Sequence, residues 1–290
     1  MTRCFRHVVA VDWSGQAVAR PKGLAVALAG SGGAAPMLIE QAPGWSRASI
    51  LAGLLDLADR SADVLIGLDL SPGLPFMDEG AYFPGGGNSA ADAKQLWRLV
   101  DERSAGDEHL AVGSFLRDPD MSRHFRQQHA TGDRFPAGAG RLRVTEQAQR
   151  AVRLSPSSCF NLIGAAQVGK SSLTGMRVLH RLGGRIPVWP FDPVPASGPL
   201  IVEIYTSIAA RAAGLPPGRS KVRDAQALDE GLARLGSRPH APLARYDDHA
   251  TDAILTAAWM RAVAHDATLW TPAAMTSAVA RTEGWTFGVR

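Results

Sequence analysis

Two apolar runs that each end in a carboxylate stand out in the hydrophobic pattern of the chain. Residues 7–12 are rich in valine without polar alternation, which is typical of a strand buried on both faces. Residues 64–71 repeat this pattern, and turn residues follow both runs. The sequence therefore predicts two core strands that carry Asp12 and Asp69 near their carboxyl ends.

The segment between these runs predicts how the two strands are connected. Short apolar stretches at residues 24–28 and 37–39 indicate two further strands, and residues 46–60 show apolar positions at helical spacing. A helical crossover between parallel neighbours is right-handed and returns the chain beside the first strand. We therefore expect Asp12 and Asp69 close together, at the sheet edge where ligands gather in open α/β folds.

The second half of the chain adds further acidic candidates. Residues 200–205 predict another core strand with Glu203 in its middle, where a charge is costly unless it is paired or holds a metal. Residues 248–265 predict a closing helix that carries Asp248 and Asp252 four positions apart, on one face. The alternative role for Asp247 or Asp248 is a helix N-cap, and for Asp69 a turn former.

Residues 75–158 interrupt this pattern and are predicted to be an insertion within a single domain of residues 1–290. The stretch is rich in glycine and arginine, and His124 and His129 are expected to be exposed because they lack ligand-like partners. Residues 117–153 carry an excess of four positive charges, which equals the net charge of +4 of the whole chain. Such a patch suits nucleic acid, with Arg141 and Arg143 as candidate contacts, or is simply a solvated surface.

The composition is that of an ordinary globular protein. Hydrophobic residues make up 46% and charged residues 20% of the chain. The apolar runs are shorter than the ~18 residues of a membrane span, and the N-terminal run is unlike a signal peptide, so we expect a cytoplasmic protein without a membrane partner. Cys4 and Cys159 lie far apart, which indicates reduced thiols instead of a disulfide framework or a zinc knuckle.

The order of the elements and acidic positions resembles the ribonuclease H-like fold, and the motifs resemble one of its branches, the predicted-nuclease family catalogued as domain of unknown function 429. The closing helix also looks like the Asp-Ala-rich helix of junction-resolving nucleases, in which the two carboxylates are usually three apart instead of four. The resemblance implies an α/β fold with a mixed five-stranded sheet flanked by helices, the insertion after the fourth strand, and nuclease activity. The motifs that carry it span nearly the whole chain: Val11-Asp12-Trp-Ser-Gly15, Ile66-Gly-Leu-Asp69, Arg143-Val-Thr-Glu146, Gln167-Val-Gly169, Val202-Glu-Ile-Tyr205 and Asp248-His-Ala-Thr-Asp-Ala253.

Acidic residues at these positions fit metal-dependent hydrolysis of a phosphodiester. Two divalent ions about 4 Å apart can activate a water and stabilise the leaving oxygen, and Mg²⁺ or Mn²⁺ prefers carboxylate oxygens. Asp12 is expected to bridge both ions, while the ligand from the closing helix is left open between Asp247, Asp248 and Asp252. The candidate catalytic and metal-binding residues are Asp12, Asp69, Glu203, Asp248 and Asp252.

One motif points to a different activity. Residues 164–171 match the phosphate-loop pattern G-x-x-x-x-G-K-[ST] after a possible strand at residues 159–163, so Gly164, Gly169, Lys170 and Ser171 are candidate phosphate-binding residues. The next core strand offers Glu203 in mid-run instead of a terminal Walker-B Asp, which argues against an ATPase. The remaining interpretations are a nucleic-acid phosphate held at a helix N-terminus, a glycine loop that allows close packing, or a non-catalytic nucleic-acid- or nucleotide-binding module of the same fold.

Overall fold

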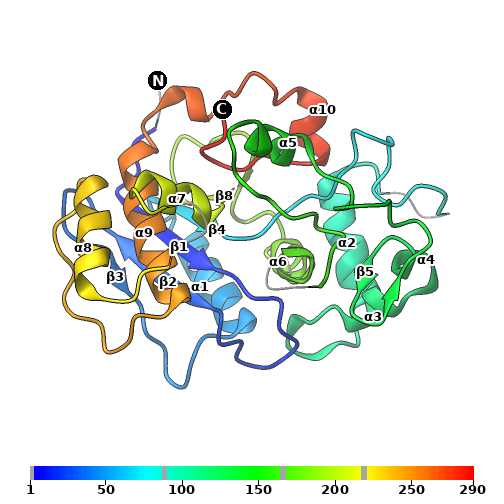
Figure 1. Cartoon of the computed structure of the whole chain (residues 1–290), viewed down its shortest axis with the longest axis horizontal. Coiled ribbons are helices and arrows are strands. Elements are labelled where there is room, and N and C mark those ends of the chain that lie inside the picture. Colours follow the sequence, from blue (N-terminus) through cyan, green and yellow to red (C-terminus); the bar gives the residue numbers. More distant parts are fainter. Residues whose placement is uncertain (1–2, 87–89, 164–167, 217–220) are drawn as a thin grey trace.

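The computed structural model describes residues 3–86, 90–163, 168–216 and 221–290. These residues form a mixed six-stranded sheet with helices on both faces (Figure 1), which confirms the predicted α/β class. The strand order is β3-β2-β1-β4-β8-β7, and β2 runs antiparallel to the rest of this sheet. The strands are β1 (His7–Asp12), β2 (Ala25–Ala29), β3 (Met37–Leu38), β4 (Val64–Leu68), β7 (Val188–Trp189) and β8 (Leu200–Glu203).

The prediction of five strands was wrong by one. The additional strand, β7, consists of two residues in the Pro-rich stretch before β8, and it pairs with β8 in parallel. Two apolar residues between prolines are too short to show an alternating pattern, so the sequence offers no strand signal there. A separate two-stranded sheet is formed by β5 (Arg126–Gln127) and β6 (Ala130–Thr131).

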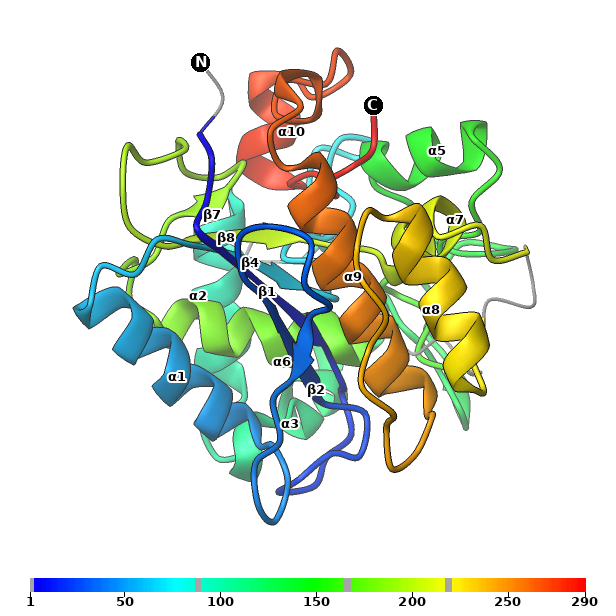
Figure 2. The same cartoon turned by 90° about the vertical axis from the view of Figure 1, so that its left-hand side faces the viewer.

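Helices cover both faces of the sheet because the strands alternate between two hydrophobic cores. Along β1, Val9 and Val11 contact one core, whereas Val8 and Ala10 belong to the other. Figure 2 shows the two groups of helices on either side of the strands. The first core is closed by α1 (Arg47–Asp59), α2 (Ala93–Arg103) and α6 (Val168–Arg181), and the second by α7 (Thr206–Ala212), α8 (Ala225–Arg234) and α9 (Asp248–Val263).

Small residues allow α9 to pack closely against the sheet. Ala10 of β1 and Ala25 and Ala27 of β2 belong to the core beneath this helix. A Cβ atom on Gly67 of β4 would lie 2.6 Å from Sδ of Met260 in α9, so glycine at this position allows the helix to approach the strand closely. The close approach brings the first turns of α9 to the carboxyl edge of β1 and β4.

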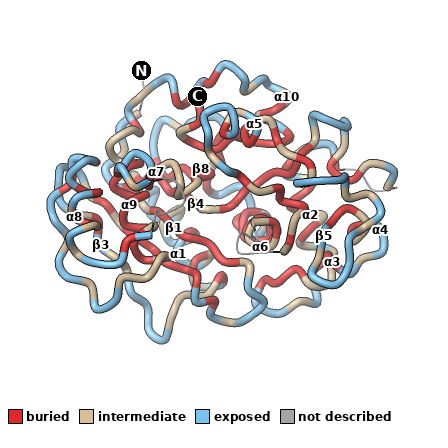
Figure 3. Tube along the Cα trace, in the orientation of Figure 1, coloured by how far each residue is buried: buried red, intermediate tan, exposed pale blue. Residues whose placement is uncertain are grey.

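Residues 75–158 contribute to the first core through α2, which packs against α6. His124, expected to be exposed, is 4% exposed and lies edge-on to Phe83, with Phe160 also in contact, so that expectation was wrong. These aromatic residues are distant in sequence, and their convergence carries no local signal. Figure 3 shows buried stretches in this region as well as around the sheet. Its remaining elements are η1 (Glu108–Leu110), α3 (Gly113–Arg117), α4 (Pro119–Ser122), β5, β6 and α5 (Val144–Ala151).

The chain after α9 forms η2 (Ala267–Leu269) and α10 (Ser277–Thr282). Across the described residues, none of the helices is long and apolar enough to span a bilayer.

Candidate functional site

The carboxyl groups of Asp12 and Asp69 meet at the ends of β1 and β4. The parallel register places Val11 opposite Leu68, and the Asp69 amide donates to the Val11 carbonyl over 3.0 Å. After burial, the charge of Asp12 is the largest effect that raises the pKa of Asp69, so the two carboxyl groups are adjacent. The predicted proximity of the two carboxylates is therefore confirmed.

Helix α9 brings a histidine and a third carboxylate to this pair. Asp247 is the N-cap of the helix and accepts a hydrogen bond of 2.9 Å from the Ala250 amide. In the first turn, Nδ1 of His249 lies 2.7 Å from Oδ2 of Asp12. Asp252 follows three residues later, and its charge acts on Asp69. Helical spacing thus delivers His249 and Asp252 from one face of α9.

Burial and mutual repulsion raise the pKa values of the three carboxyl groups. Burial raises the pKa of Asp12, while the hydrogen bond from His249 opposes this effect. Burial and then the charges of Asp12 and Asp252 raise the pKa of Asp69 well above its usual value. Burial, followed by the charge of Asp12, raises the pKa of Asp252 to about 7. In the absence of a cation, the cluster therefore retains protons at a pH where ordinary aspartates are ionised.

Asp248 takes a different position from Asp252. It forms ion pairs with Lys221 and Arg223, and the hydrogen bond from Arg223 is the main reason why its pKa is lowered. The three aspartates that the sequence left open thus have separate surroundings: Asp247 caps the helix, Asp248 pairs with two cations, and Asp252 interacts with Asp12 and Asp69. Asp252 is the one that remains a candidate ligand beside the carboxylate pair.

Glu203 does not join the aspartates, because its carboxylate is held by Arg143. Nη2 and Nη1 of Arg143 donate to the two oxygens of Glu203 over 2.6 and 2.8 Å. The hydroxyl of Thr286 also donates to Glu203, over 2.7 Å. Both charged side chains are at least 96% buried. Glu203 is the last residue of β8, its buried charge is compensated by an ion pair, and its expected role as a metal ligand is not supported.

We expected Arg141 and Arg143 to contact nucleic acid from an exposed patch. The expected exposure was wrong, because both guanidinium groups are buried. Arg141 is 6% exposed and donates to the carboxylate of Asp78 and to the Tyr82 carbonyl, each over 2.8 Å. Arg143 is fully buried and also donates to Glu146 over 2.9 Å. Sequence composition counts these charges but does not show that acidic partners already neutralise them.

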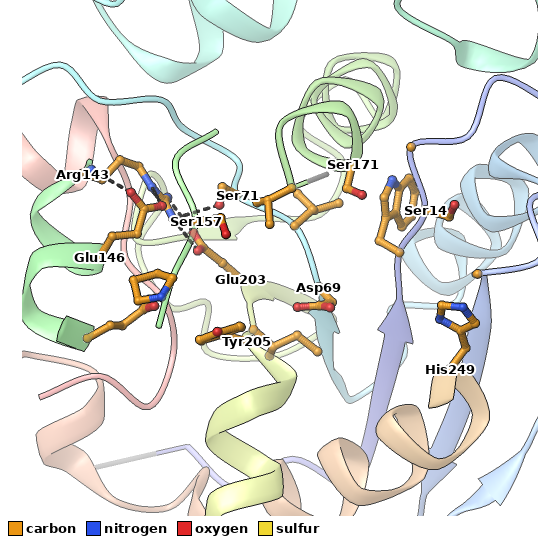
Figure 4. Close-up of a pocket in the computed structure, with 18 of the residues that line it drawn as sticks. Ser14, Asp69, Ser71, Arg143, Glu146, Ser157, Ser171, Glu203, Tyr205 and His249 are labelled. Carbon is orange, nitrogen blue, oxygen red and sulfur yellow. Dashed lines mark hydrogen bonds and ion pairs between the residues drawn. The ribbon is translucent and has the colours of Figure 1, made fainter. Parts of the chain in front are cut away.

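A cavity of about 500 Å³ extends from the aspartates to the Arg143 ion pair. Figure 4 shows His249 at one side, Arg143 and Glu146 at the opposite side, and Asp69 and Tyr205 between them. The loop after β1 contributes Ser14 to the wall. Other lining residues are Trp13, Gly15, Gln16, Ser71, Gln149, Pro156, Ser157, Val168, Ser171 and Glu203.

The phosphate-loop match lies partly outside the described residues, because Gly164 falls in the gap at 164–167. The preceding residues 159–163 do not form a strand of the main sheet; Asn161 makes an isolated bridge to Arg126. A Cβ atom on Gly169 would lie 2.0 Å from the Cys159 carbonyl, so this glycine permits close packing. Lys170 packs against Gly15, and Ser171 lines the cavity. The first turn of α6 therefore adjoins the site without the strand context of a nucleotide-binding loop.

Two contributors to the site were not predicted from the sequence. His249 precedes Asp252 by three positions, so helical spacing alone could have placed the two side chains on one face. The backbone amide of Thr206, at the start of α7, donates to the Asp69 carboxylate. This contact depends on how α7 leaves β8 and has no signature in the sequence.

The donor set of the site consists of carboxylate oxygens and one imidazole, which is chemistry that divalent cations accept. Within the described parts of the chain, the side chains as they stand form no group of three His, Cys, Asp or Glu that encloses a metal ion. Comparisons of the sequence and the structure found no matching family model, no matching curated protein and no matching solved structure.

Proposed function

We propose that the protein is a divalent-metal-dependent phosphodiesterase, a nuclease of the ribonuclease H-like fold. The observation that carries this proposal is the contact between the Asp12 and Asp69 carboxyl groups, with Asp252 and His249 delivered beside them by α9. Buried carboxyl groups with raised pKa values are typical of sites that bind cations or transfer protons. The resemblance of the sequence motifs to the predicted-nuclease family points to the same chemistry.

The topology of the sheet supports the assignment of the fold. Three strands form an antiparallel meander, a helix crosses over to β4, and β8 then adds in parallel on the far side of β4. This is the order of elements expected from the sequence, with β7 as an extra edge strand. Both strand-end aspartates and the closing helix thereby converge at one edge of the sheet.

In the proposed site, Asp12, Asp69 and Asp252 supply the hard oxygen donors that Mg²⁺ or Mn²⁺ prefers, and His249 lies beside them. Such ions, when bound, activate water and neutralise charge on the leaving oxygen of a phosphodiester. The chain itself fixes the donors: strand pairing holds Asp12 beside Asp69, and the hydrogen bond from His249 orients the Asp12 carboxylate. Glu203 is paired with Arg143 and is not included among these donors.

The proposal is tested by Mg²⁺- or Mn²⁺-dependent cleavage of single-stranded, duplex and branched DNA and RNA. We expect Asp12→Asn to abolish cleavage, and His249→Ala to lower the rate by about 10- to 100-fold because Asp12 loses its orienting partner. Asp248→Asn is the matched control on the same helix, and it should retain the wild-type rate because an exposed ion pair contributes little.

Equal rates for the wild type and Asp12→Asn would refute the nuclease mechanism. Binding of nucleic acid without cleavage of any substrate would favour the non-catalytic binding module. Both results are read against unfolding curves of each variant, so that loss of fold is not mistaken for loss of activity.

A further inference from the structure

The cavity beside the aspartates differs in charge between its two sides. The side with His249 and Asp69 adjoins Asp12 and Asp252, so carboxyl groups that can bind a cation are concentrated there. A phosphate group can approach this side when cations accompany it. The opposite side holds the buried pair of Arg143 and Glu203. Which part of a ligand binds at each side depends on whether Arg143 has hydrogen-bond donors to spare.

Arg143 has none to spare, because its five donors already have acceptors. Nε donates to Glu146, Nη1 to Glu203 and to the carbonyl of Glu283, and Nη2 to Ser71 and to Glu203. The distances range from 2.6 to 3.0 Å. This side of the cavity therefore lacks the free guanidinium that a second phosphate group would require.

Tyr205 provides an aromatic surface between the two sides. It lies two residues after β8, at the N-cap position of α7, and is half-buried against the cavity (Figure 4). Its hydroxyl donates to the Ser155 carbonyl over 3.3 Å, which ties the ring to the segment that supplies Pro156 and Ser157 to the wall. Burial raises the pKa of the Tyr205 phenol, and the nearby Asp69 carboxylate adds to this effect. An anchored ring beside the acidic cluster is a suitable stacking partner for a planar base.

We propose that the cavity binds one unpaired nucleotide, with its phosphate at the aspartates, its base against Tyr205 and its sugar among the serine hydroxyls of the wall. A cavity of about 500 Å³ is of the size that encloses a small ligand and is too small for a duplex. This inference rests on the proposed function and narrows its substrate to nucleic acid or nucleotides that present a free base. The same chemistry is offered by a free nucleotide and by an unpaired nucleotide within a strand.

Binding is measured with Ca²⁺ in place of Mg²⁺, so that the readout does not depend on cleavage. The probes are adenosine monophosphate, a short single-stranded oligonucleotide that carries one 2-aminopurine, and a blunt duplex of the same sequence. We expect the single strand to bind more tightly than the duplex, with quenching of the 2-aminopurine as its base stacks. Equal affinity for adenosine monophosphate and the oligonucleotide indicates a free nucleotide as ligand, whereas tighter binding of the oligonucleotide indicates a strand.

Variants of Tyr205 test the stacking surface. Tyr205→Leu keeps an apolar side chain but removes the ring, and it should weaken binding of the single strand by about tenfold or more because the aromatic face is lost. Tyr205→Phe is the matched control, which loses the hydrogen bond to Ser155 but keeps the ring, and it should bind within about threefold of the wild type. Thermal unfolding of both variants shows whether they are folded.

The inference is overturned if Tyr205→Leu binds as tightly as the wild type, or if the duplex binds at least as tightly as the single strand. These outcomes leave the proposed nuclease activity untouched. Conversely, a protein that binds the single strand through Tyr205 but does not cleave it with Mg²⁺ or Mn²⁺ would refute the nuclease proposal and retain the nucleotide pocket.

Discussion

Arg143 holds both carboxylate oxygens of Glu203 in a buried fork, with hydrogen bonds of 2.6 and 2.8 Å between residues that lie 60 positions apart. The pair closes one side of the cavity, and the opposite side, with Asp69 beside Asp12, is the one where we propose that a cation binds. Bidentate pairing fixes the geometry of both side chains more firmly than a single contact does. We therefore infer that Glu203 stabilises the structure beside the proposed site by pairing with Arg143, and that it is not a metal ligand.

The first prediction follows from this ion pair. Glu203→Gln should lower the free energy of unfolding by about 1–3 kcal/mol, because it weakens two charge-assisted hydrogen bonds of the buried Arg143 guanidinium while Glu146 remains as its second carboxylate partner. Urea denaturation measures the loss. Glu102→Gln is the control, since the pair of Glu102 with Arg98 is exposed and should contribute less than about 1 kcal/mol. A Glu203→Gln protein of normal stability that no longer responds to Mg²⁺ would instead identify Glu203 as a metal ligand.

The pairing of Asp12 and Asp69 was predictable because both lie at the ends of continuous apolar runs. A run buried on both faces implies a central strand, and a single helix between two such runs implies parallel neighbours. The register then follows from topology without knowledge of side-chain contacts. The same pattern of buried strands connected by helices predicted the α/β class of the fold, which the structure confirms.

The role of Glu203 could not be predicted in the same way. The sequence shows that a charge in the middle of a buried strand needs a partner, but a metal and an arginine satisfy that need equally well. Arg143 lies in a region whose arginines resemble a surface patch by composition. The sequence also could not show whether Asp248 or Asp252 is the candidate ligand, because the two carboxylates are four positions apart on one helix. The cations that pair with Asp248, Lys221 and Arg223, come from another segment of the chain.

The second prediction concerns Asp252 and pH. Its folded-state pKa of about 7 exceeds the ordinary value of 3.8, so the folded protein binds more protons than the unfolded chain between about pH 4 and 7. The stability of the metal-free protein should therefore fall as the pH rises through this window. Asp252→Asn should recover roughly 2–4 kcal/mol of that loss, because each pKa unit corresponds to about 1.4 kcal/mol.

Urea denaturation at pH 5 and pH 8, with EDTA or with Mg²⁺, measures both parts of this prediction. Mg²⁺ should stabilise the wild type at pH 8 by neutralising the cluster, and it should stabilise Asp252→Asn much less. Asp266→Asn is the control, since a hydrogen bond from Thr268 lowers the pKa of this carboxyl group, which is therefore already ionised at pH 5 in both states. Identical pH profiles for the wild type and Asp252→Asn would show that Asp252 is not part of a strained acidic cluster.

The third prediction separates packing from nucleotide binding at the start of α6. Gly169→Ala should destabilise the protein by about 1–3 kcal/mol or more, because the new methyl group would lie 2.0 Å from the Cys159 carbonyl and 2.4 Å from Cδ2 of Leu162. Lys170→Ala should leave stability unchanged. If Lys170 contacts a phosphate group as proposed, the substitution should weaken nucleic-acid binding modestly and reduce the dependence of affinity on salt by about one charge.

Titration with ATP distinguishes the competing interpretation of the same residues. In a nucleotide-binding loop, the lysine contacts the β- and γ-phosphates, so the wild type would bind ATP at micromolar concentration and Lys170→Ala would not. We expect no micromolar binding by either protein, because residues 159–163 are not a strand of the main sheet that leads into the loop. ATP binding that disappears in Lys170→Ala would overturn this assignment, whereas destabilisation confined to Gly169→Ala would identify close packing as the reason for the glycine.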